Sequence, residues 1–199
     1  SPERLVAAGV TLPHDDTITR TEGGAVVVCS RLAGVTAYDL LGSEQQLQPL
    51  LAKLAEQGLL EVDGAALNCV RIAAGTPWFH DDLVADIIPL EALLKSHVSV
   101  TKGCYPGQEI VARITNRGQV SRKLVRLTAP AGPAPAPGAE LSGCAPHEGK
   151  AAGLVTSSCI DPVDNSVQAL GYVRRLFFKS QTPLTAGGLA LQVHSLDGD

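Results

Sequence analysis

The sequence predicts an α+β protein in which a module of strands and helices precedes a small antiparallel β-barrel. Two short runs rich in β-branched residues, 25–29 and 35–41, come directly before a helical pattern at 43–58. This order of strand, strand and helix is typical of α+β folds and argues against a doubly wound parallel sheet. Beyond residue 118 the chain instead contains strand-like runs, at 119–128, 151–159, 167–175 and 188–194.

The first predicted elements are a short helix and a pair of strands. Residues 2–9 carry adjacent apolar residues and end at Gly9, a residue type that commonly ends helices. The runs at 25–29 and 35–41 are apolar, and a loop containing Gly34 separates them. We therefore expect them to pair as strands.

The helix at 43–58 has the clearest signals in the chain. Ser43 and Gln46 have the spacing of a capping box, and Gly58 has the place of a left-handed residue beyond the last turn. Four leucines recur at helical spacing and define one apolar face, namely Leu47, Leu50, Leu51 and Leu54. The strands and this helix together make half of a ferredoxin-like ββα unit. Residues 65–74 fit either a helix or a strand.

Another helix is predicted at 106–117. Pro106 suits the first helical position, Glu109 and Arg113 have the favourable i, i+4 spacing, and Gly118 ends the helix. Its apolar face comprises Ile110, Val111 and Ile114. We place a domain boundary here, so that residues 1–118 form the α+β domain and residues 119–199 the β-barrel domain, with a proline-rich loop at 129–138.

The composition is that of a globular protein. Hydrophobic residues make up 45% of the 199 residues and charged residues 18%, which excludes disorder along the whole chain. No apolar run approaches the roughly 20 residues that a bilayer requires, and we expect neither a signal peptide nor a membrane partner. Five cysteines without Cys-x-x-Cys spacing predict free thiols in a reducing compartment.

Positive charge is concentrated in one short block. The formal net charge is −4, yet residues 102–126 carry six basic residues and one acidic residue. Such a block indicates either a local anionic partner or a solvated helix end and strand face. An RNA-binding module would use Arg113, Arg117, Arg122, Lys123 and Arg126. The acidic remainder of the chain and the lack of interleaved aromatic residues argue against nucleic acid as the partner.

Cys104 is the residue with the most evident chemistry. It comes just before the predicted helix at 106–117, whose first N–H groups favour an anion, and Lys102 lies two residues away. Both features favour a reactive thiolate. Gly103 and Gly107 would let the backbone turn sharply beside it. The alternative is a tight loop around a buried cysteine.

The segment Lys102-Gly-Cys-Tyr-Pro-Gly-Gln-Glu109, with Arg113 and Arg117-Gly118 after it, resembles the signature of the YgfZ family. These are folate-binding proteins related to the glycine cleavage T-protein, an aminomethyltransferase. Upstream segments resemble the family in the same order, at 71–77, 86–91 and 98–103. The resemblance begins partway into the family's first module, so we expect a chain that lacks the N-terminal part.

The resemblance implies a partial T-protein-like folate-binding module over 1–118 and a C-terminal β-barrel over 119–199. It implies a role in the assembly, maintenance or repair of iron–sulfur enzymes, including enzymes that modify tRNA, in the bacterial cytoplasm or in mitochondria. By position in the signature, Cys104 would be the reactive thiol with Lys102 beside it. Tetrahydrofolate would be bound by Tyr105, Gly107, Gln108, Glu109, Arg113 and Arg117.

Two features bear on tetrahydrofolate as the cofactor. Ala73 stands where related proteins carry a glutamate that binds the pterin ring, and a methyl group cannot form that bidentate pair. An aminomethyltransferase of the T-protein type, the alternative function, would need this glutamate and an aspartate from the preceding part, so whether the chain is an enzyme stays open. Trp78 could stack on a pterin or pack in the core.

Two short segments have the composition of metal sites, His14-Asp15-Asp16 and His80-Asp81-Asp82. Neither has the spacing of a helical zinc pair, and Asp-rich surface loops are common. We therefore predict no metal site.

Overall fold

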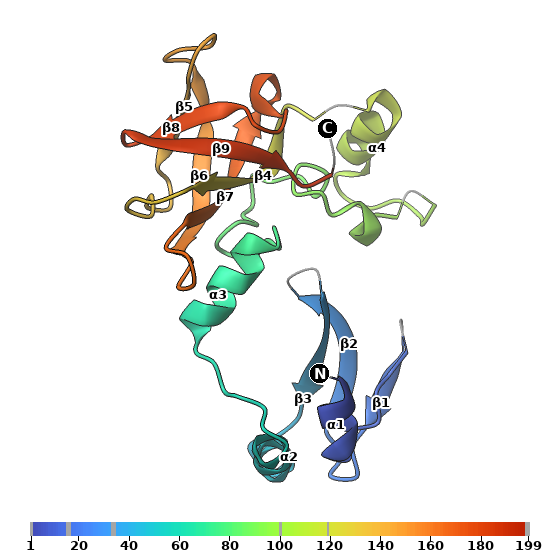
Figure 1. Ribbon diagram of the computed structural model, residues 1–199. Coiled ribbons are helices and arrows are strands. Elements are labelled where there is room, and N and C mark those ends of the chain that lie inside the picture. The colour runs from blue at the N-terminus through green and yellow to red at the C-terminus, as the bar shows by residue number, and fades with distance from the viewer. Residues whose placement is uncertain (1, 15–16, 33–34, 100, 119, 198–199) are drawn as a thin grey trace. The chain divides into compact units, whose positions relative to one another are not determined.

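The computed structural model describes residues 2–14, 17–32, 35–99, 101–118 and 120–197, without the side chains of residues 31, 32, 35 and 117. The chain divides into two compact units, Ser1–Leu67 and Asn68–Asp199 (Figure 1). The fold is α+β, as predicted, with a closed barrel of six antiparallel strands in the second unit. Within the described ranges, no helix has both the length and the apolar character needed to cross a membrane.

The first unit is a three-stranded antiparallel sheet with two helices, in the order β1-β2-β3. Its elements are α1 (Pro2–Ala7), β1 (Ile18–Arg20), β2 (Val26–Leu32), β3 (Val35–Leu41) and α2 (Glu44–Glu56). The predicted helix at the start, the strand pair and the following helix are confirmed, while the Gly34 loop lies outside the described residues. Strand β1 has three residues, too few to show an alternating pattern.

Helix α2 begins and ends as its sequence predicts. The N–H of Ser43 donates to Oε1 of Gln46 at 2.8 Å within a capping box, and Gly58 has a φ of 72°. Leu50 and Leu54 are buried with Val27, but Leu51 is 51% exposed. The predicted four-leucine face is therefore wrong at Leu51, because a step of one residue turns a helix by about 100°.

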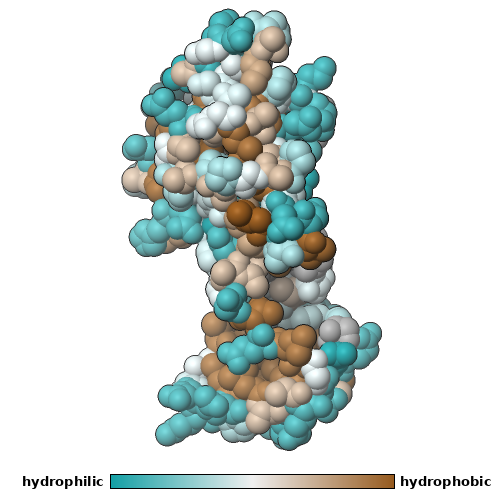
Figure 2. Space-filling model, turned by 60° about the vertical axis from the view of Figure 1, so that its left-hand side comes forward, coloured by the Kyte–Doolittle hydropathy of each residue, from teal (hydrophilic) through white to brown (hydrophobic). Residues whose placement is uncertain are grey.

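The second sheet face of this unit carries exposed apolar residues beside charged ones. The registers place Ile18, Val26, Val28 and Leu41 on the face opposite buried Val27, together with Arg20 and Asp39. Ile18 is 60% exposed and Leu41 57% exposed. Figure 2 shows apolar surface gathered on this unit.

The second unit contains a closed barrel in the order β4-β7-β6-β5-β8-β9. Its elements are α3 (Gly64–Ala73, which begins in the first unit), α4 (Gln108–Arg117), β4 (Arg122–Ala129), β5 (Glu140–Gly143), β6 (Ala151–Ile160), β7 (Val167–Arg174), β8 (Pro183–Ala186) and β9 (Leu189–Ser195), with 3₁₀ turns at Lys95–His97 and Arg175–Phe177. The four predicted strand regions correspond to β4, β6, β7 and β9. The segment at 65–74, which fitted either structure, is helical.

The segment before the barrel packs with the barrel. Ile72 of α3 and Ala92 form one buried cluster with Leu124, Leu170 and Tyr172 of the strands. The boundary between compact units therefore falls at 67/68, whereas the sequence placed a domain boundary at 118, where the barrel strands are about to begin. A shared apolar cluster groups residues 68–118 with the strands that follow them.

His194 provides a pH-dependent contribution to the stability of the barrel. It lies opposite Arg126 in the β4–β9 pair, and its Nε2 is 2.8 Å from Oγ1 of Thr128. Burial, and then the charge of Arg126, lower the pKa of His194 below its usual range. The unfolded chain consequently binds a proton at a higher pH than the folded chain does. The stability that neutral His194 contributes is fully present above about pH 6.5. It is lost as the pH falls through the pKa that His194 has in the folded protein.

We expect the urea midpoint of unfolding to fall between about pH 7 and about pH 5, and to fall less in His194→Gln. His97→Gln, at an exposed 3₁₀ turn, is the matched control and should follow the parent. Equal pH dependence in parent and His194→Gln would show that other groups dominate this range.

Candidate functional site

The loop before α4 presents Cys104 to solvent. The N–H of Lys102 donates to Oγ of Ser99 at 3.1 Å, and the hydroxyl of Tyr105 donates to the carbonyl oxygen of Ser99 at 3.5 Å. Nζ of Lys102 lies 4.7 Å from the centre of the Tyr105 ring. These contacts fold the loop onto Ser99, and Cys104 is exposed. The alternative of a buried cysteine does not apply.

Helix α4 begins two residues later than predicted. Gly107 has a φ of 87° and is the N-cap, so the helix starts at Gln108 and Pro106 lies outside it. Glycine readily adopts a left-handed backbone conformation. At Gly107 this conformation interrupts the helical turn that would have made Pro106 the first residue of the helix. Val111 is buried, but Ile110 is 44% exposed, which corrects the predicted apolar face.

The predicted site residues on α4 have different environments. Gln108 is half-buried, whereas Glu109 and Arg113 are exposed. The ion pairs found among the described residues do not include Glu109 with Arg113. Arg117 is the last residue of α4, and its side chain lies outside the described part.

Three cations of the basic block have partners within the protein. Nε of Arg122 donates to Oε2 of buried Glu91 at 2.9 Å, Nζ of Lys123 lies 2.6 Å from Oδ1 of Asp197, and Arg126 donates to the carbonyl oxygen of Ala73 at 3.0 Å. Burial alone would raise the pKa of Asp197, but hydrogen bonds from Lys123 and Ser195 lower it overall. The block is therefore no continuous basic surface, which weakens the RNA-binding hypothesis.

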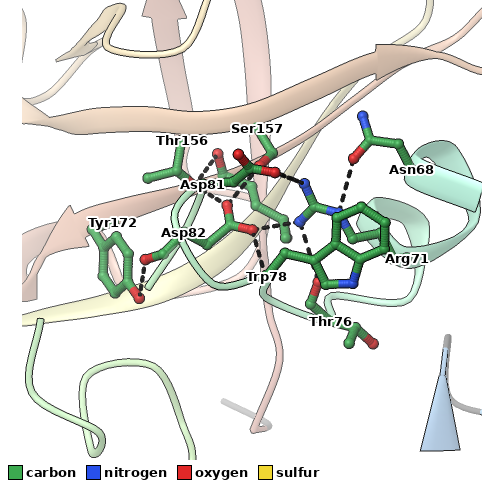
Figure 3. Close-up of polar contacts among 10 residues, drawn as sticks. Asn68, Arg71, Thr76, Trp78, Asp81, Asp82, Thr156, Ser157 and Tyr172 are labelled. Atoms are coloured by element: carbon green, nitrogen blue, oxygen red, sulfur yellow. Dashed lines mark hydrogen bonds and ion pairs between the residues drawn. The ribbon is translucent and has the colours of Figure 1, made fainter. Parts of the chain in front are cut away.

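A buried ion pair joins α3 to the loop that contains Asp82, and hydrogen bonds connect the pair to the barrel (Figure 3). Arg71 and Asp82 are 1% and 0% exposed and form a direct pair. Nη2 of Arg71 also donates to Oγ of Ser157 at 2.8 Å. Asp82 accepts further hydrogen bonds, from the N–H of Trp78 at 2.9 Å and from the hydroxyls of Ser157 and Thr156. The carboxylate is fully engaged, so the His80-Asp81-Asp82 segment does not offer it to a metal.

Tyr172 completes this network from β7. Its hydroxyl donates to the carbonyl oxygen of Asp82 at 3.1 Å. Burial, and then the charges of Asp82 and Glu91, raise the pKa of Tyr172 well above its usual value, so the phenol remains a donor at neutral pH. No pattern in the sequence points to this role of Tyr172.

Trp78 lies in this network and not in the loop around Cys104. Its ring centre is 4.8 Å from the guanidinium carbon of Arg71. The described contacts of Trp78 and those of residues 102–105 share no residue. One signal in the sequence could have indicated the network, since Arg71 is the single charged residue of α3 and lies between Val70 and Ile72.

Two cavities of the second unit lie near the network or beside α4. One, of about 570 Å³, is lined by Asp82, Asp86, Arg122, Glu140, Tyr172 and Arg174 among others. The other, of about 400 Å³, lies beside α4 and is lined by Ile114, Leu93, Val98 and Lys95 among others. None of the predicted site residues lines either cavity.

Comparison with known proteins gives relatives of two kinds. The chain is 36% identical over 132 residues to the tRNA-modifying protein YgfZ of Yersinia enterocolitica, and this match covers 65% of the chain and 39% of that protein. It is 28% identical over 136 residues to a putative chloroplastic transferase of Arabidopsis thaliana, covering 67% of the chain and 30% of that protein. No family model matches the sequence.

A solved structure shows the same fold. The glycine cleavage system aminomethyltransferase T of Bartonella henselae superposes with a TM-score of 0.78 at 25% sequence identity, over 98% of this chain and 55% of that one. The chain thus spans well under two thirds of the length of the proteins that it matches.

Proposed function

Because this is a partial YgfZ-like chain with a T-protein-like fold, we propose that it is a folate-binding accessory protein for the assembly, maintenance or repair of iron–sulfur enzymes, including enzymes that modify tRNA. The observation that carries the proposal is Cys104, exposed in a loop that Ser99, Lys102 and Tyr105 hold in shape just before α4. A cytoplasmic location in bacteria, or a location in an organelle, accompanies the proposal.

The proposed ligand is tetrahydrofolate, recognised along α4. The exposed cations Lys102 and Arg113 would attract the carboxylates of its glutamate tail. Tyr105, Gly107, Gln108 and Glu109 would contact the ligand, with Arg117 and Trp78 as further candidates.

The remaining part of the proposed tetrahydrofolate site would come from sequence that this chain does not span. The exposed apolar side chains of Ile18 and Leu41 on the sheet are of the kind that further protein would cover. Ala73, at the end of α3, offers a methyl group where the pterin would need a carboxylate.

Calorimetric titration with tetrahydrofolate tests the proposal. We expect weak binding to this chain alone and stronger binding once it is joined to the part of the Yersinia protein that it does not span. In that joined protein Ala73→Glu should tighten binding by about tenfold or more, because a carboxylate can pair bidentately with the pterin.

Ala74→Glu is the control, since it adds the same charge one residue away. Equal tightening by both variants would mean general electrostatic attraction and not a pterin contact. Binding to neither protein would leave a scaffold without a folate ligand. Transfer of a one-carbon unit from a lipoyl carrier protein would favour the aminomethyltransferase alternative.

A further inference from the structure

Two cysteines far apart in the sequence meet where α3 packs on β6. The thiol of Cys69 lies 3.6 Å from the carbonyl oxygen of Ile160, the residue after Cys159, and the two thiols interact. Both residues are half-buried, so small molecules in solution can reach them. A disulfide between them requires the two sulfur atoms to approach to about 2.05 Å.

The surroundings give the two thiols different chemical roles. Burial, and then the hydrogen bond and charge of Cys69 and the charge of Asp161, raise the pKa of Cys159 to about 12, against a lowering by Arg71. Cys159 therefore stays protonated at neutral pH. Thiol–disulfide exchange requires a thiolate as the attacking group, so it would begin at Cys69.

We propose that Cys69 and Cys159 form a redox-active dithiol that a low-molecular-weight disulfide, such as oxidised glutathione, converts into an intramolecular disulfide. In the first step the Cys69 thiolate attacks the glutathione disulfide, forms a mixed disulfide and releases one glutathione thiolate. In the second step the sulfur of Cys159 loses its proton to solvent and attacks the sulfur of Cys69. The second glutathione leaves as its thiolate, so two protein thiols are oxidised and one glutathione disulfide is reduced.

The bond would fasten a helix that apolar packing of Ile72 and several polar contacts now hold to the strands. Besides the Cys69 contact, α3 is held to the strands by Arg71 with Ser157 and by the carbonyl oxygen of Ala73 with Arg126. A covalent link from α3 to β6 would oppose local opening of this helix. The dithiol is separate from Cys104, so the proposal does not depend on the proposed function.

Mass spectrometry of the full chain after treatment with oxidised glutathione tests the proposal. In a Cys104→Ser background, which removes intermolecular disulfides at the exposed loop, we expect a mass lower by two hydrogen atoms. A non-reducing digest should then contain one peptide pair that joins residues 69 and 159. Cys159→Ser should instead accumulate a stable glutathione adduct at Cys69, and Cys144→Ser should behave as the parent does.

The thermal midpoint supplies a second readout. Oxidation should raise the Tm of the parent by about 5–10 °C and leave Cys69→Ser unchanged, because a cross-link restricts the unfolded chain. Glutathione that remains on Cys69 in the parent, or an unmodified Cys69 and Cys159 while other cysteines react, would overturn the proposal.

Discussion

Asp82→Ala is expected to lower the free energy of unfolding by about 3–5 kcal/mol, because it leaves the guanidinium of Arg71 buried without its counter-charge. The substitution also removes the acceptor of the Trp78 N–H and of two hydroxyl groups. The Tm should fall by roughly 10–20 °C in a protein of this size. Trp78 is the single tryptophan of the chain and lies within the network, so its fluorescence during urea unfolding follows the relevant unit.

Asp81→Ala is the matched control for this prediction. Its carboxylate also reaches Arg71, at 3.4 Å, but its side chain is 52% exposed, so the loss should stay below about 1 kcal/mol. The double variant Arg71→Met with Asp82→Leu should recover much of the stability, because it removes both charges together. A loss for Asp82→Ala no larger than that for Asp81→Ala would contradict a stabilising role for the buried pair.

Cys104→Ser is expected to abolish function in the cell while leaving the fold intact. The side chain is exposed and belongs to none of the buried clusters, so the Tm should change by no more than about 1 °C. The measurement is complementation of a bacterial strain that lacks its YgfZ protein, read as the activity of iron–sulfur enzymes and the content of modified tRNA nucleosides. The protein expressed in that strain would be this chain joined to the part of the Yersinia protein that it does not span.

Cys144→Ser provides the comparison, because Cys144 is half-buried and lies just after β5. It should complement as well as the parent does. If Cys104→Ser also complements fully, the thiol has no part in the function, and the proposal would then depend on ligand binding alone.

Local sequence patterns were sufficient for most of the fold. A capping box, a glycine beyond the last turn and spaced leucines identify α2, and strand-like segments of eight to ten residues identify β4, β6 and β7. Strands β5 and β8 have four residues each, too few to distinguish from loops. The closure of the barrel through these two strands therefore could not be foreseen in detail.

The site was predictable only in part for a different reason. The exposed loop around Cys104 depends on residues that are close in sequence, such as Ser99 and Tyr105. The network around Arg71 instead depends on a contact with Ser157, 86 residues away. Sequence spacing carries no information on such a contact, so Asp81 and Asp82 could only be considered as members of an acidic loop.

Barrel closure also determines where another polypeptide could extend a sheet. In β4-β7-β6-β5-β8-β9 every strand has a neighbour on both sides, so the barrel has no edge strand. In the first unit β1 and β3 each have one neighbour within the described sheet. Among the described strands, β1 and β3 are therefore the edge strands to which a peptide could add.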